Sequence, residues 1–73
     1  MSVIFGEGMV VRRVLVRAKD VVYLKGVIDS QEGLAHVFGE SGGDLTIAAP
    51  IGREKELDDL LTELLAELEG SRL

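Results

Sequence analysis

The side chains that could do chemistry in this chain are few, and the most distinctive are its single tyrosine and its single histidine. Tyr23 and Lys25 stand two positions apart in a segment with helical spacing, so their side chains do not face each other. His36 falls in an expected strand, and without a cysteine or a second histidine it lacks the three or four suitable ligands of a metal site. We therefore expect no catalytic residue, no metal and no cofactor, and we interpret the protein as not being an enzyme.

Two glycine-rich stretches are the other candidates for a site. The stretches "GEG" at positions 6–8 and "SGG" at positions 41–43 are too short for a phosphate-binding loop and match neither the Walker nor the dinucleotide spacing. Glycine and serine are common turn residues. Both stretches are therefore predicted to be turns.

Composition and charge describe one small, acidic, aliphatic domain over residues 1–73. Hydrophobic residues make up 47% of the chain and aromatic residues only 4%, so valine, leucine, isoleucine and alanine must form the core. The net charge of −5 gives a field that repels phosphate, which argues against a nucleic-acid partner. The first residues lack a basic leader segment, and no apolar run is long enough to span a membrane. We expect a cytoplasmic protein without a membrane partner.

Residues 10–18, "VVRRVLVRA", are rich in β-branched side chains and predict a strand. Alternation divides them into a core face and a half-polar outer face. The core face carries Val10, Arg12, Val14, Val16 and Ala18, and the outer face carries Val11, Arg13, Leu15 and Arg17. These four outer residues are our candidate interface.

The rest of the chain predicts a helix, a hairpin and a second helix. Asp20 is expected at the start of the first helix, and Gly33 is expected to end it. Strands over residues 34–39 and 45–50 should follow, joined by a loop of about four to six residues. From Arg53 the leucines recur at i, i+3, i+4, i+7 and i+8, which predicts an amphipathic helix with Gly70 as its C′ residue.

The order β-α-β-β-α predicts an α+β, ferredoxin-like, two-layer sandwich with an antiparallel-mixed sheet, in which a parallel strand pair flanks the first helix. Its usual last strand would be missing, because residues 70–73 read as a short polar tail. A bare sheet edge invites association. We expect either that residues 2–5, within an N-terminal extension of residues 1–9, cover the first strand, or that two molecules pair through it.

The first helix and the strand after it also carry a motif. It resembles that of a group of short bacterial proteins classed as a domain of unknown function, with a D-[VI]-x-Y-L-K helix followed by E-G-L-A-x-V. The matching residues are Asp20, Tyr23, Leu24, Lys25, Glu32, Gly33, Leu34, Ala35, Val37 and Pro50. The resemblance implies a fold and no activity. The layout is also similar to that of heavy-metal-associated and ACT-type domains, without the Cys-x-x-Cys of the first or the Gly-rich turn of the second.

Three functions follow as expectations. The leading one is a non-enzymatic module that acts through self-association, as a homodimer, and through contacts with an unidentified protein. The alternative is an ACT-like small-molecule sensor with its ligand at a dimer interface, beside the candidate ligand turn of Arg17, Lys19 and Asp20, because helix N-termini favour anions. The least favoured is a nucleic-acid binder using Arg12, Arg13 and Arg17.

Overall fold

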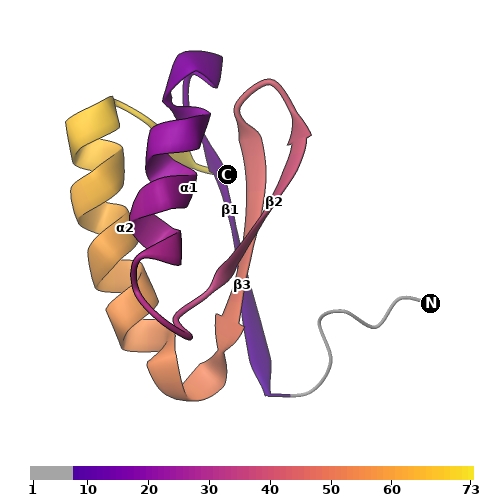
Figure 1. Ribbon diagram of the computed structural model, residues 1–73, viewed down its shortest axis with the longest axis vertical. Coiled ribbons are helices and arrows are strands. Elements are labelled where there is room, and N and C mark those ends of the chain that lie inside the picture. Colours follow the sequence, from indigo (N-terminus) through magenta and orange to yellow (C-terminus); the bar gives the residue numbers. More distant parts are fainter. Residues whose placement is uncertain (1–7) are drawn as a thin grey trace.

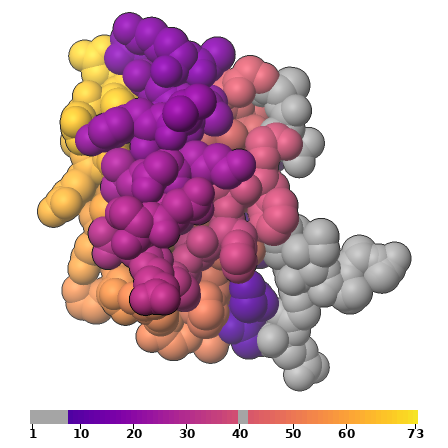
Figure 2. Space-filling model, viewed as in Figure 1, coloured from indigo at the N-terminus to yellow at the C-terminus, as the bar shows by residue number. Residues whose placement is uncertain are grey.

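The two helices of the chain lie side by side on one face of a single sheet, as Figure 1 shows, and Figure 2 gives the same view as a space-filling model. The computed structural model describes residues 8–73, with the side chains of Glu40 and Ser41 excepted, so the expected strand at residues 2–5 lies outside the described residues. The strands are β1 (Met9–Leu15), β2 (His36–Ser41), β3 (Asp44–Pro50) and β4 (Ser71–Arg72). The helices are α1 (Val21–Asp29) and α2 (Glu54–Leu68), each preceded by a 3₁₀ turn, Ala18–Asp20 and Ile51–Arg53. The expected α+β class and two-layer sandwich are confirmed.

The sheet has the order β2-β3-β1-β4, and all three of its strand pairs are antiparallel. The predicted parallel pair is wrong, and so is the mixed sheet. β1 and β2 do run in the same direction, but the β2–β3 hairpin places β3 between them. The connection between β2 and β3 is also shorter than expected, because Gly42 and Gly43 alone form the turn.

The edge of β1 has a strand that the sequence did not predict. β4 pairs with the end of β1, opposite Val14 and Leu15, and the N–H of Leu73 donates to the carbonyl oxygen of Arg13 at 2.9 Å. The prediction that residues 70–73 form only a tail is therefore wrong. Two backbone pairs are enough for this short strand because Arg72 is also held by α2 through Asp58.

Aliphatic side chains fill the space between the sheet and the helices, as their spacing predicted. On β1 the buried residue is Val14, Val16 beyond its end is also buried, and Val11 and Leu15 are exposed on the opposite face. This confirms the two faces assigned to residues 10–15. The strand is shorter than predicted, because it ends at Leu15, and Ala18, expected on the core face, is exposed in the 3₁₀ turn that follows. The helices contribute seven buried residues, each stabilising the fold by about 2 kcal/mol through removal of apolar surface from water. They are Leu24, Ile28, Leu57, Leu61, Leu64, Leu65 and Leu68.

Candidate functional site

The face of the sheet opposite the helices carries most of the predicted interface. Val11, Arg13 and Leu15 alternate along β1, with Val11 37% and Leu15 44% exposed. The strand register places His36 in the row of Val11 and Phe38 in the row of Arg13, two strands away. The guanidinium of Arg13 pairs with Asp44 of β3. We call these five residues, Val11, Arg13, Leu15, His36 and Phe38, the outer face.

Arg17, the fourth residue of the predicted interface, does not join the outer face. It lies beyond the end of β1, and its Nη2 donates to the carbonyl oxygen of Leu68 at 3.1 Å. Its guanidinium also lies 3.3 Å from the carboxylate of Asp20 and 3.7 Å from that of Glu69. A cation at this position complements the negative end of the α2 dipole. Arg17 thus fastens the C-terminus of α2 to the turn before α1.

The candidate ligand turn of Arg17, Lys19 and Asp20 contains the ion pair between Arg17 and Asp20. Arg17 and Asp20 neutralise each other, while Lys19 is exposed in the 3₁₀ turn between them. Asp20 occupies the N-cap position of α1, but its side chain makes no capping hydrogen bond, because its carboxylate is turned towards Arg17. Two of the three charged residues of the turn, Arg17 and Asp20, therefore have a structural role.

A cluster of charges joins β1, β4 and α2, and sequence reasoning missed it. Arg12 contacts Glu54 and donates through Nε to Asp58 at 3.0 Å, and Arg72 donates to the same carboxylate at 3.0 Å. Two hydrogen bonds, the stronger effect coming from Arg12 and the weaker from Arg72, lower the pKa of Asp58 below its usual value. The signal that could have revealed the cluster is Arg12 itself, a charge on the core face of its strand.

Replacing Asp58 with asparagine should lower the free energy of unfolding at neutral pH by about 1 kcal/mol. Hydrogen bonds to a charged group contribute more than this when buried, but the carboxylate of Asp58 is 35% exposed and solvent weakens them. Because the folded-state pKa is lowered, this contribution is present above the unfolded pKa and is lost as pH falls through the folded value. Urea unfolding at several pH values measures it.

Asp59→Asn is the matched control, because Asp59 is next in sequence and pairs only with Lys55 on the surface, at 3.0 Å. Such a pair on one helix is worth about 0.3–0.5 kcal/mol. The unfolding curves of Asp58→Asn and the wild type should converge in acid. A difference that stays constant down to low pH would show that the carboxylate's charge is not responsible.

Tyr23 lies on α1 and His36 on β2, so the two side chains are on different surfaces of the protein. The hydroxyl of Tyr23 donates to Glu67 of α2 at 3.3 Å, and the negative charge of Glu67 raises the pKa of the phenol above its usual value. A phenol with a raised pKa stays protonated, which suits a hydrogen-bond donor between two helices. His36 is exposed on the outer face.

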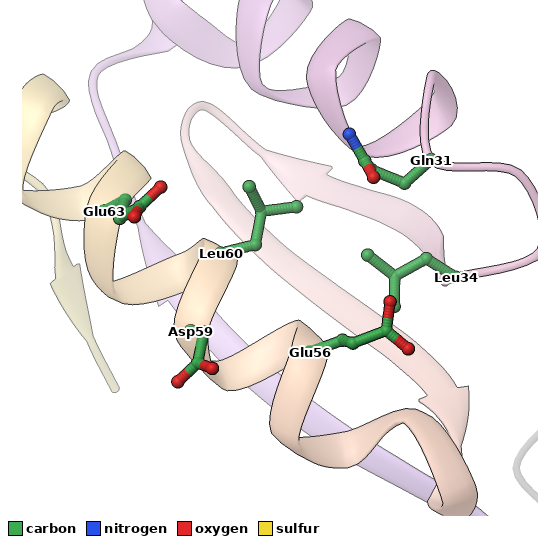
Figure 3. A pocket seen from close by; sticks show the side chains of 6 residues that line it. All are labelled: Gln31, Leu34, Glu56, Asp59, Leu60 and Glu63. Atoms are coloured by element: carbon green, nitrogen blue, oxygen red, sulfur yellow. The ribbon is translucent and has the colours of Figure 1, made fainter.

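A shallow pocket of about 250 Å³ lies between the segment after α1 and the side of α2 (Figure 3). Gln31 and Leu34 line one side, and the other side is lined by Glu56, Asp59, Leu60 and Glu63. Two of its three carboxylates form ion pairs on α2: Glu56 with Arg53, which lowers the pKa of Glu56, and Asp59 with Lys55. Within residues 8–73 no group of three or more acidic or histidine side chains is arranged to hold a metal ion.

Three of the motif residues have structural roles. Leu24 and Leu34 are buried in the core, and Gly33 has a left-handed φ of 72° in the turn between α1 and β2.

Among the described residues, no helix is both long enough and apolar enough to cross a membrane. Comparison of the chain with protein-family models, with curated proteins and with solved structures found no match.

Proposed function

We propose that this protein is a small non-enzymatic module of the ferredoxin-like type, which self-associates as a homodimer and acts through contacts with other proteins. The order β2-β3-β1-β4, with both helices on one face, supports the fold assignment, since a βαββαβ chain of this type needs its first and third strands side by side in the centre.

The observation that carries the functional part is the outer face. Val11, Leu15 and Phe38 are each more than a third exposed there, on a side of the sheet that neither helix covers. Apolar side chains exposed together with polar ones on one face are a feature of protein-interaction surfaces. Arg13 and His36, interleaved with them, supply polar contacts.

The charged groups support a structural module over an enzyme. A catalytic site brings groups with shifted pKa values together in a cleft. Here the shifted groups that the structure describes are Arg12, Tyr23, Arg53, Glu56 and Asp58, and each is held in an ion pair or hydrogen bond. The contacts of Arg12 with Asp58 and of Tyr23 with Glu67 join different elements, and the Arg53–Glu56 pair lies at the start of α2.

Light scattering of the full chain over a concentration series tests the self-association. We expect a mass of twice the 7.9 kDa chain at about 50 μM, a concentration at which a homodimer with a Kd of a few micromolar is the main species. A strict monomer at that concentration would contradict the proposal.

The contact role of the outer face needs a separate variant. Leu15→Ser removes an exposed side chain that takes no part in the core, so the fold should be retained within about 0.5 kcal/mol. Capture of proteins from the native host should weaken with this variant. Val22→Ser, which alters an 82%-exposed valine on α1, is the control that should leave capture unchanged.

A further inference from the structure

Hydrogen bonds at the two ends of β1 show which of its backbone groups point towards β3. The N–H of Ile51 donates to the carbonyl of Gly8 at 2.7 Å, and that of Val16 donates to the carbonyl of Gly43 at 3.0 Å. Both bonds follow the register of the β1–β3 pair. Because backbone groups alternate in direction along a strand, the even-numbered residues of β1 bond to β3 and the odd-numbered ones point to the other side.

The odd-numbered residues therefore present their N–H and C=O groups at the edge of β1. Arg13 confirms this, since its carbonyl accepts from the N–H of Leu73 at 2.9 Å. Met9 and Val11 also point to this edge, but β4 ends short of them, and within residues 8–73 no strand pairs with them there. Among the described residues, the edge at Met9 and Val11 thus presents backbone donors and acceptors that no strand uses, and these form a template for another strand.

Two features make this edge more suitable for pairing than the opposite one. Charged side chains usually protect sheet edges, but Arg12 is held by Glu54 and Asp58 and Arg13 pairs with Asp44. The charges near the β1 edge are thus neutralised within the chain. The edge strand β2, by contrast, has a register shift between Gly39 and Ser41, and such a bulge disrupts extended pairing.

The position of β4 and the number of edge residues that can pair together favour one register for a second copy of β1. In an antiparallel pair, opposite residues that both point to the shared edge exchange two hydrogen bonds. Pairing Met9 with Val11 of the second copy, and Val11 with its Met9, satisfies this and leaves Arg12 opposite a glycine, Gly8. A register shifted by two residues towards β4 would put the second copy's Met9 where Leu73 already lies. A shift of two residues the other way would pair Met9 with the second copy's Met9 and leave Val11 without a partner among residues 8–73.

We infer that two copies of this chain join their sheets by antiparallel pairing of β1 about a two-fold axis at Val10. This inference rests on the proposed self-association and names the surface that makes it. The two copies would form one continuous sheet, with the helices of both copies on the same side of it. The two outer faces would then lie next to each other and form one larger surface for a protein partner.

Cysteine cross-linking tests this register. The chain has no cysteine, so Val10→Cys introduces a single thiol. In this register the two copies of residue 10 form a non-hydrogen-bonded pair with Cα atoms about 4.5 Å apart, a distance that a disulfide spans. Pairing raises the effective concentration of the second thiol to about the millimolar range. We expect most Val10→Cys chains to become covalent dimers on a non-reducing gel after mild oxidation at micromolar concentration.

Val37→Cys is the matched control. Val37 is also a half-buried strand valine that packs against the core, but it lies on β2, at the opposite edge of the sheet. It should remain mainly monomeric under the same conditions. Linking of Val37→Cys in place of Val10→Cys would move the interface to β2 and overturn the inference.

The remaining outcomes separate this inference from the proposed function. If light scattering shows a dimer but neither cysteine links, the β1 register is wrong and self-association stands. If the wild type is a strict monomer, because the chain's own N-terminal segment takes this edge or for any other reason, both are wrong.

Val11→Pro gives a second, independent test. The N–H of Val11 points to the edge, so proline there removes a donor from the second copy without removing a bond to β3. We expect a folded monomer, judged by circular dichroism and light scattering, with dimerisation weakened at least about tenfold, or 1.4 kcal/mol. A folded Val11→Pro variant that dimerises like the wild type would overturn the inference.

Discussion

Replacing Gly43 with alanine should destabilise the protein by about 4 kcal/mol, from about 3 kcal/mol of overpacking and about 1 kcal/mol for a lost backbone hydrogen bond. A Cβ atom at Gly43 would lie 1.5 Å from the carbonyl oxygen of Val16 and 2.6 Å from its carbonyl carbon. These are backbone atoms, so no side chain can move aside to make room. The two segments would have to separate, breaking the bond between the N–H of Val16 and the carbonyl of Gly43.

A loss of this size is decisive for such a small domain. At about 0.05–0.15 kcal/mol per residue, a chain of this length has roughly 4–11 kcal/mol of total stability. Gly43→Ala should therefore be largely unfolded, or should unfold at a much lower urea concentration than the wild type. Circular dichroism during urea titration measures both.

Gly42→Ala is the matched control for Gly43→Ala. Gly42 is the adjacent turn residue, with a left-handed φ of 61° and no atom within 4 Å of an added Cβ. Alanine there meets only the backbone strain of the left-handed region, about 1–2 kcal/mol. If both variants lost the same stability, the close approach to Val16 would not be the reason that position 43 needs glycine.

The sequence predicted the features that depend on periodicity. The two faces of β1, the buried stripe of α1 and the leucine stripe of α2 all follow from the spacing of apolar side chains, and burial in the structure confirms them. The turn at positions 42 and 43 was also predicted. Its shortness and the different reasons for its two glycines were not, because both depend on which backbone lies against the turn.

Features that depend on a few long-range contacts escaped prediction. β4 has only two residues, Ser71 and Arg72, and no periodic pattern can reveal so short a strand. It forms because Arg72 reaches Asp58, fourteen positions earlier, where Arg12 also binds. Three of the four candidate interface residues lie on the outer face, as alternation along the strand predicted. Arg17 does not, because it lies beyond the end of β1 and donates to the carbonyl oxygen of Leu68 at the end of α2.

The end of α2 gives the second prediction with a large effect, in which two neighbouring residues respond in opposite directions. Gly70 was expected to be the left-handed C′ residue of α2, but that conformation belongs to Glu69, with φ 59°. Replacing Glu69 with glycine should therefore stabilise the protein by about 1 kcal/mol, because glycine adopts a positive φ without the cost that a Cβ imposes. The ion pair lost with Arg17 is solvent-exposed and contributes little.

Gly70→Ala should instead destabilise the protein by about 2–3 kcal/mol through overpacking. An added Cβ would lie 2.7 Å from the carbonyl oxygen of Leu15, 2.8 Å from Val16 Cγ1 and 2.9 Å from Leu65 Cδ2. The side chains can shift, but the backbone of β1 cannot do so without loosening its pair with β4.

Thermal unfolding measures both variants, since 1 kcal/mol corresponds to about 4–8 °C in a domain of this size. Glu69→Gly should raise Tm by roughly that amount, and Gly70→Ala should lower it by two to three times as much. Glu69→Gln, which removes the charge and keeps the Cβ, should leave Tm nearly unchanged and so separates backbone strain from the lost ion pair. A fall in Tm for Glu69→Gly would mean that Gly70, and not Glu69, turns the chain from α2 into β4.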